Sequence, residues 1–109
     1  MNNNNNNNIN IIPAKSYYDL EKCKGIILKE NKGKCGIYRL TNLINNKSYI
    51  GSSVNLGRRL YDYYYIDKFK KINNKSDILI GNAILKYGIF NFQLDIIEYC
   101  DLNILTKKE

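Results

Sequence analysis

The sequence predicts a small α/β fold of the α+β type, in which a three-stranded antiparallel sheet is flanked by helices. Two short apolar runs, residues 35–40 and 48–51, lie on either side of a polar turn. Two segments with helical spacing follow, and a last segment alternates between apolar and polar residues. This order of strand, strand, helix, helix and strand is typical of one sheet with helices packed against it.

The chain of 109 residues has room for one hydrophobic core. Asn2 to Asn8 form a homopolymeric tract without apolar content, which favours disorder. The apolar residues that follow, up to Leu28, have mixed spacing and could form a loose helix packed on the domain. We therefore expect a disordered tail and a poorly defined lead-in over residues 1–28, and one folded domain over residues 29–109.

The first two strands are predicted to form a hairpin, because Asn45-Asn46-Lys47 tolerates the left-handed backbone of a tight turn. Tyr38 and Tyr49 lie in the two strands. For any hairpin, the default interpretation of two such tyrosines is a packed cross-strand pair. Gly51 ends the second strand and would let the backbone turn sharply or pass close to a ligand.

A short amphipathic helix is predicted next, with N-cap candidates in residues 52–55 and apolar residues at helical spacing from Leu56 onward. Arg58 and Arg59 lie near its start, where cations are mildly unfavourable against the helix dipole. They therefore require an anionic partner or are simply solvated. Gly57 costs up to about 1 kcal/mol relative to alanine in a helix, and the sequence gives no reason for it.

A basic loop separates this helix from a second one, and its lysines either contact phosphates or are solvated. Ser76 or Asp77 is expected to cap the second helix and Gly88 to end it. The alternating segment from Phe90 to Ile96 predicts the third strand. Asp101 could cap a final helix that has barely begun when the chain stops.

The composition sets limits on partners and environment. A net charge of +7 favours a polyanionic partner such as nucleic acid, although a solvated basic surface would explain it equally well. The three cysteines are far apart and the chain has no histidine, so we expect reduced structural thiols rather than a zinc site. No apolar run approaches the roughly 20 residues that span a bilayer, and no protein partner is evident.

Asn, Ile, Lys and Tyr are abundant, and their codons are rich in A and T. This composition indicates an AT-rich genome, as in many organelles. The amino terminus lacks the features of a transit peptide, so a protein working in an organelle would be made there.

Six short blocks carry a resemblance to a known family. They are Gly36-Ile37-Tyr38, Tyr49 to Ser53, Asn55 to Leu60, Lys86-Tyr87-Gly88, Asn91-Phe92 and Ile96 to Asp101. In this order they resemble the GIY-YIG endonucleases, most closely the homing endonucleases encoded in group I introns of fungal mitochondria. The resemblance covers roughly residues 29–109. It implies a DNA endonuclease that hydrolyses phosphodiester bonds with Mg²⁺ or another divalent ion, acts on double-stranded DNA and works in the mitochondrion.

The resemblance also implies roles for individual residues. Tyr38 matches the tyrosine that deprotonates the attacking water or helps to do so, and Tyr49 matches a second tyrosine that positions water or phosphate. Arg59 matches the arginine that stabilises negative charge on the scissile phosphate. Glu109 matches the glutamate that binds the divalent ion. These roles fit the chemistry, because an arginine never loses its charge and a carboxylate is a preferred Mg²⁺ ligand.

Further residues complete the expected site. Gly36 and Gly51 are expected to be structural, with Gly51 matching the glycine that keeps space clear. The expected DNA-binding residues are Arg58, Lys68, Lys70 and Lys71.

Two departures from the family pattern stand out. Where many relatives have a histidine in the first helix, this chain has the run Tyr63-Tyr64-Tyr65. Family members also continue beyond the metal-binding glutamate, whereas this chain stops at Glu109, so we expect a carboxyl-terminally truncated domain. The alternative function is therefore a catalytically inactive remnant or a weak basic module that binds nucleic acid through residues 58–75.

Overall fold

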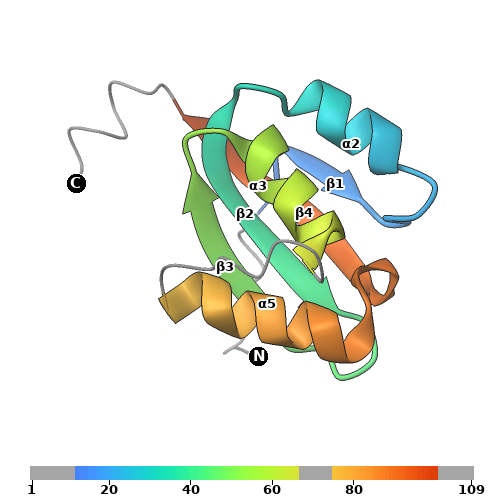
Figure 1. Ribbon diagram of the computed structural model, residues 1–109. Helices are drawn as coiled ribbons and strands as arrows, with labels where there is room; N and C mark the ends of the chain where they lie inside the picture. Colours follow the sequence, from blue (N-terminus) through green and yellow to red (C-terminus); the bar gives the residue numbers. More distant parts are fainter. Residues whose placement is uncertain (1–11, 67–74, 101–109) are drawn as a thin grey trace, which may run out of the picture.

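The computed structural model of the chain describes residues 12–66 and 75–100 (Figure 1). Its elements are β1 (Lys15–Tyr17), α2 (Lys24–Glu30), β2 (Cys35–Asn42), β3 (Ser48–Ser53), α3 (Leu56–Tyr64), α5 (Lys75–Tyr87), the 3-10 turn η1 (Ile89–Asn91) and β4 (Phe92–Cys100). In this described part of the chain, no helix is both long and apolar enough to cross a membrane.

The strands form one antiparallel sheet in the order β1-β4-β2-β3. The predicted α+β fold with an antiparallel sheet and flanking helices is thus confirmed. The sheet has four strands rather than three, because β1 pairs with β4 and places Tyr17 opposite Leu94. A strand of only three residues has too little pattern to be recognised in the sequence.

The lead-in is a defined part of the fold from Lys15 onward. Tyr17, Leu20 and Ile27 are buried in the hydrophobic core. The helix α2 continues through Glu30, two residues beyond the segment up to Leu28 for which a loose helix was considered. The strand β1 is therefore part of the sheet, and α2 contributes Ile27 to the core, whereas the asparagine tract lies outside the described residues.

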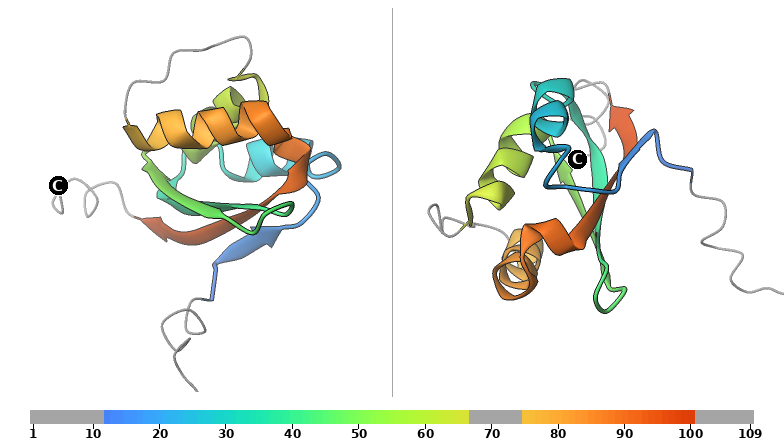
Figure 2. Two further views of the ribbon diagram at one scale, coloured as in Figure 1. Left: turned by 90° about the horizontal axis from the view of Figure 1, so that it is seen from below. Right: turned by 90° about the vertical axis from the view of Figure 1, so that its right-hand side faces the viewer.

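The three described α-helices lie on one side of the sheet (Figure 2). The buried residues of the core come mainly from β1, β2, β4, all three helices and the segment before α2, and Tyr49 of β3 packs against them. Its fully or nearly fully buried members are Tyr17, Leu20, Ile27, Tyr38, Leu40, Leu56, Leu60, Tyr63, Ile80, Ile84, Phe92, Leu94 and Ile96. The apolar residues at helical spacing in α3, such as Leu56 and Leu60, thus face the sheet, as do Ile80, Ala83 and Ile84 of α5.

The turns follow the predicted chemistry. Asn46 in the β2–β3 hairpin has φ of 64°, and Gly88 after α5 has φ of 86°, so both adopt the left-handed backbone expected of them. Asn55 caps α3 through its side chain, which accepts a hydrogen bond from the Arg58 amide at 3.2 Å. The start of α5 at Lys75 precedes both expected caps.

The last strand begins later and runs further than the alternating pattern predicts. Phe90 belongs to η1 and is exposed, so its assignment to the strand is wrong. The strand proper starts at Phe92 and ends at Cys100, because pairing with β2 continues past a bulge opposite Ile37 and Tyr38. From Phe92 to Ile96 the predicted alternation holds, with apolar residues toward the helices.

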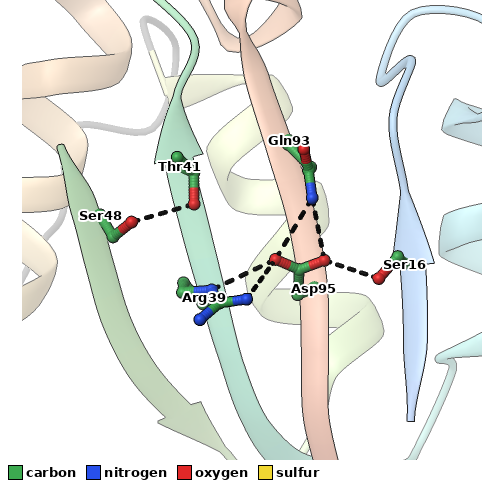
Figure 3. A network of polar contacts seen from close by, with 6 residues as sticks. All are labelled: Ser16, Arg39, Thr41, Ser48, Gln93 and Asp95. Carbon is green, nitrogen blue, oxygen red and sulfur yellow. Dashed lines mark hydrogen bonds and ion pairs between the residues drawn. The ribbon is translucent and has the colours of Figure 1, made fainter. Parts of the chain in front are cut away.

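Asp95 is the centre of a polar network on the other face of the sheet (Figure 3). Its carboxylate accepts hydrogen bonds from Ser16 Oγ at 2.7 Å and from Arg39 Nε and Nη2 at 3.2 and 3.0 Å. Gln93 Nε2 donates to it at 3.2 Å. The Asp95 side chain is only 2% exposed. A buried charge requires such partners, and here they join β1, β2 and β4.

Candidate active site

Tyr38 lies in the middle of β2, on the face that the helices cover, and is fully buried. Its hydroxyl oxygen is 2.7 Å from that of Tyr63 in α3, and either group could be the donor. The two rings meet edge to face, with centroids 6.1 Å apart. The two phenol groups are therefore in direct polar contact inside the core.

Gly51 lies directly opposite Tyr38 in the β2–β3 register. A Cβ atom at this position would be 2.5 Å from both Cζ and the hydroxyl oxygen of Tyr38. Real Cβ atoms essentially never approach another heavy atom so closely. The space that this glycine keeps clear is therefore occupied by the phenol end of Tyr38.

Tyr49 lies two residues before Gly51, on the same face of β3, and is partly buried. Its register partner is Leu40, and its ring centroid is 6.5 Å from that of Phe92. The register places Gly51, rather than Tyr49, opposite Tyr38. Tyr38 and Tyr49 are therefore diagonal neighbours rather than register partners, and both face the helices.

Arg59 is in the first half of α3 and is partly exposed. It precedes Tyr63 by four residues, and residues at this spacing share one face of a helix. Since Tyr63 reaches Tyr38, the same face of α3 carries Arg59 toward the side of the sheet on which Tyr38 and Tyr49 lie. The structure thus brings three of the predicted catalytic residues to one side of the hairpin.

Arg58 points to solvent, with 73% of its side chain exposed. Its Nε donates to Asp62 Oδ1 at 3.3 Å, one helical turn later. An exposed pair at this spacing contributes only about 0.3–0.5 kcal/mol. Asp62 is one anionic partner for an arginine near the start of the helix, and the exposed guanidinium can still reach a phosphate.

Gly57 and Gly36 allow close approaches around the start of α3. A Cβ at Gly57 would be 2.8 Å from Lys32 Cα, in the loop after α2. A Cβ at Gly36 would be 2.5 Å from the Glu98 carbonyl oxygen. The sequence offered no reason for Gly57 because its neighbour is the loop of residues 31–34, more than twenty residues earlier in the chain. The cost of a glycine within α3 is thus explained by the docking of this helix against the α2–β2 connection.

The described residues, 12–66 and 75–100, contain no cluster of three or more metal-ligating side chains of the His, Cys, Asp or Glu type. Mg²⁺ prefers carboxylate and phosphate oxygens, so neither the phenols nor Arg59 suits it. Glu109, the predicted ligand, lies outside the described residues, as do Lys68, Lys70 and Lys71.

Tyr63 is the member of the site whose contact the sequence did not predict. The pattern marked it as an apolar-face residue of the helix and as a tyrosine where relatives have histidine. Its hydrogen bond to Tyr38 depends on how α3 crosses β2, which no local pattern specifies. Its spacing of four residues from Arg59 is the signal that could have associated it with the site.

Comparison with known proteins gives the class of the domain. The profile of the GIY-YIG catalytic domain matches residues 34–106. This range includes the hairpin with Tyr38, Tyr49 and Gly51 and the helix with Arg59 and Tyr63. The chain therefore belongs to the GIY-YIG family, and its folded part is a nuclease domain.

A curated relative is similar over much of the chain. "Probable intron-encoded endonuclease 1" of Neurospora crassa is 37% identical over 81 residues. The aligned region covers 74% of this chain but only 23% of the relative, so the chain corresponds to less than a quarter of that protein. No solved structure matches the chain significantly.

Proposed function

We propose that this chain is the catalytic domain of a homing-type endonuclease that hydrolyses phosphodiester bonds of double-stranded DNA with the help of a divalent metal ion. The observation that carries the proposal is the arrangement around α3. One face of this helix bears Arg59 and Tyr63, and Tyr63 is hydrogen-bonded to Tyr38 of the hairpin. The family membership and the name of the Neurospora relative support the same conclusion.

The exposed fractions suggest how the roles divide. Tyr49 and Arg59 are the partly buried members of the set, so we assign them to contact with the scissile phosphate. The guanidinium of Arg59 presents aligned donors to phosphate oxygens and stabilises the charge that develops in the transition state. Tyr49 positions the phosphate or the attacking water.

Tyr38 is fully buried, unlike Tyr49 and Arg59. An isolated phenol with a pKa near 10 is a poor base at neutral pH. A phenol becomes a better base when a neighbouring group stabilises its deprotonated form, and the Tyr63 hydroxyl oxygen lies 2.7 Å from that of Tyr38. We therefore assign to Tyr38 the uptake of the proton from the attacking water, or assistance in that step, with Tyr63 as its hydrogen-bond partner.

Mg²⁺ or another divalent cation is the proposed cofactor, with Glu109 as its ligand. When bound, it would supply positive charge to phosphate oxygens. Gly36 and Gly51 have structural roles, because they allow close approaches near the start of α3 and at Tyr38. Arg58, Lys68, Lys70 and Lys71 are the proposed contacts to DNA phosphates along the substrate.

The mitochondrion is the proposed site of action. The proposal depends on the intron-encoded name of the relative and on the abundance of Asn, Ile, Lys and Tyr.

The test is a nicking assay on supercoiled plasmid DNA with the 109-residue chain, in Mg²⁺ and in EDTA. We expect nicking only with the metal ion. Arg59→Ala should lower the rate at saturating DNA by about two to three orders of magnitude, the cost typical of removing one donor to a developing negative charge. Equal nicking by Arg59→Ala and the parent chain would contradict the assignment.

Arg58→Ala is the matched control, because it removes the same charge from the adjacent residue of the same helix. It should weaken DNA binding and lower the slope of log affinity against log salt by about one, with the rate at saturating DNA little changed.

One observation favours the second candidate function, an inactive module that binds nucleic acid. Tyr38 is fully buried, whereas a base must reach the attacking water. In that case neither the parent chain nor Arg59→Ala would nick DNA, yet both would bind it with strong salt dependence.

A further inference from the structure

Asn31 follows the last residue of α2 and is fully buried, although its side chain is polar. Its Nδ2 donates to the Ile27 carbonyl at 2.8 Å and to the Tyr17 hydroxyl at 3.3 Å. Its Oδ1 accepts from the Tyr99 hydroxyl at 2.7 Å. One side chain thus joins the end of α2 to both β1 and β4. A buried polar group so fully used holds its backbone in one position.

That backbone in turn holds the start of α3. The Asn31 carbonyl accepts from the Gly57 amide at 2.9 Å, and the Lys34 carbonyl accepts from the Leu56 amide at 2.7 Å. Asn55 Oδ1 accepts from the Gly33 amide at 3.0 Å, in addition to the Arg58 amide. Three hydrogen bonds therefore connect the loop of residues 31–34 to the first turn of α3.

The contact is also close in steric terms. Lys32 Cα, Lys32 N and Asn31 C would lie 2.8, 3.1 and 3.2 Å from a Cβ at position 57. All three are backbone atoms and cannot rotate away. The helix is thus seated directly on the loop, and Arg59 is two residues beyond the contact.

We propose that Asn31 is a positioning residue for catalysis, which fixes the loop of residues 31–34 and through it the first turn of α3 that carries Arg59. The inference rests on the proposed function, because it assigns Asn31 a part in that reaction. Active sites tolerate little displacement, since a misplacement of about 1 Å can lower the rate about a hundredfold. Asn31 touches no substrate in this account and acts only through the helix.

The test compares Asn31→Ala with Asn42→Ala in the nicking assay, at a temperature where both variants are folded. Asn42 is the matched control because it is also a fully buried asparagine, but it lies at the hairpin end of β2, with Oδ1 accepting from the Ile44 amide. We expect Asn31→Ala to nick at least about tenfold more slowly at saturating DNA, with the dissociation constant for DNA changed less than about twofold. Asn42→Ala should keep the parent rate.

Two outcomes of this assay would overturn the proposal. One is a folded Asn31→Ala variant that nicks at the parent rate. The other is an equal loss of nicking rate in Asn42→Ala, which would show that replacing any buried asparagine slows the reaction to the same extent. If Asn31→Ala does not fold, Gly57→Ala takes its place, because the added methyl group pushes the helix off the same loop. A folded Gly57→Ala variant with the parent rate would also overturn the proposal.

A second measurement separates this inference from the proposed function. Hydrogen exchange of the Leu56 and Gly57 amides reports on the seating of α3 without any reaction. In Asn31→Ala these amides should exchange at least about tenfold faster relative to the β2 and β4 amides, and in Asn42→Ala they should not. If the parent chain does not nick DNA, the proposed function is refuted, and unchanged exchange at both amides would then overturn the role of Asn31.

Discussion

Replacing Gly51 with alanine tests the packing on which the candidate site depends. The new methyl group would lie 2.5 Å from Tyr38 Cζ and its hydroxyl oxygen, and 3.1 Å from Cε1. Tyr38 has no room to retreat, because it is fully buried and its hydroxyl is 2.7 Å from that of Tyr63. The added methyl group must therefore shift the β2–β3 backbone or break the contact between Tyr38 and Tyr63.

Whether Gly51→Ala raises or lowers the free energy of unfolding shows whether Tyr38 packs against Gly51. Without the contact, alanine in place of a glycine with ordinary backbone angles would stabilise the fold by about 0.4–1 kcal/mol. Overpacking of a filled core costs about 1–3 kcal/mol. We therefore expect Gly51→Ala to lower the free energy of unfolding by about 1–3 kcal/mol, or Tm by roughly 5–20 °C for a domain of this size.

The assay is urea unfolding followed by circular dichroism, with Gly25→Ala as the control. Gly25 lies in α2 and has no atom within 4 Å of the position of an added Cβ. The control should therefore be as stable as the parent chain or more so. A Gly51→Ala variant as stable as Gly25→Ala would refute the packing of Tyr38 against Gly51.

Three other predictions concern single groups. Tyr63→Phe removes the hydroxyl next to Tyr38 and should slow nicking at saturating DNA at least about tenfold. The free energy of unfolding in urea should change by only about 1 kcal/mol. An unchanged nicking rate would exclude Tyr63 from the reaction. Asp95→Ala removes the carboxylate that accepts hydrogen bonds from Arg39, Ser16 and Gln93. It should lower the free energy of unfolding in urea by about 2–3 kcal/mol, less than the loss for a fully buried ion pair, because Arg39 is partly exposed. An unchanged free energy of unfolding would contradict a stabilising role of the network. The hydrogen bond from Tyr17, followed by the hydrogen bond and charge of Lys15, holds the pKa of the Glu30 carboxyl below its ordinary value of 4.5. The stability that Glu30 contributes is therefore present above about pH 4.5, and it is lost as the pH falls through the lower folded-state pKa. Glu30→Gln should flatten this acid dependence in urea titrations, and an unchanged profile would assign the dependence to other groups.

The parts of the fold with a strong local pattern were predictable. The hairpin depended on Asn46 for its left-handed turn, and Gly88 ended α5 in the same way. The alternation from Phe92 to Ile96 identified β4. These signals lie within a few residues of the chain, and each corresponds to one backbone requirement.

What could not be predicted depends on partners distant in the sequence. Ser16 and Asp95 are 79 residues apart, and only their pairing makes residues 15–17 a strand. Gly57 likewise has a reason only once the loop after α2 is seen to lie against α3. A periodic pattern reports which face of an element is buried, but it contains no information on what covers that face.

The candidate site also has a part that the sequence predicted and a part that it did not. The family blocks identified Tyr38, Tyr49, Gly51 and Arg59; in the structure both tyrosines face the helices, Gly51 lies against Tyr38, and Arg59 is in α3. The register that sets Gly51 against Tyr38, and the contact with Tyr63, come from the sheet pairing and the helix crossing. Glu109 lies outside the described residues, and its role stays a prediction.

The most direct test of the central claim is the single-turnover rate of plasmid nicking by the parent chain and by Arg59→Ala, each in Mg²⁺ and in EDTA, at saturating protein. We predict nicking by the parent chain in Mg²⁺ alone and a rate lower by about two to three orders of magnitude for Arg59→Ala. Nicking that persists in EDTA, or that is equally fast in both proteins, would contradict the account.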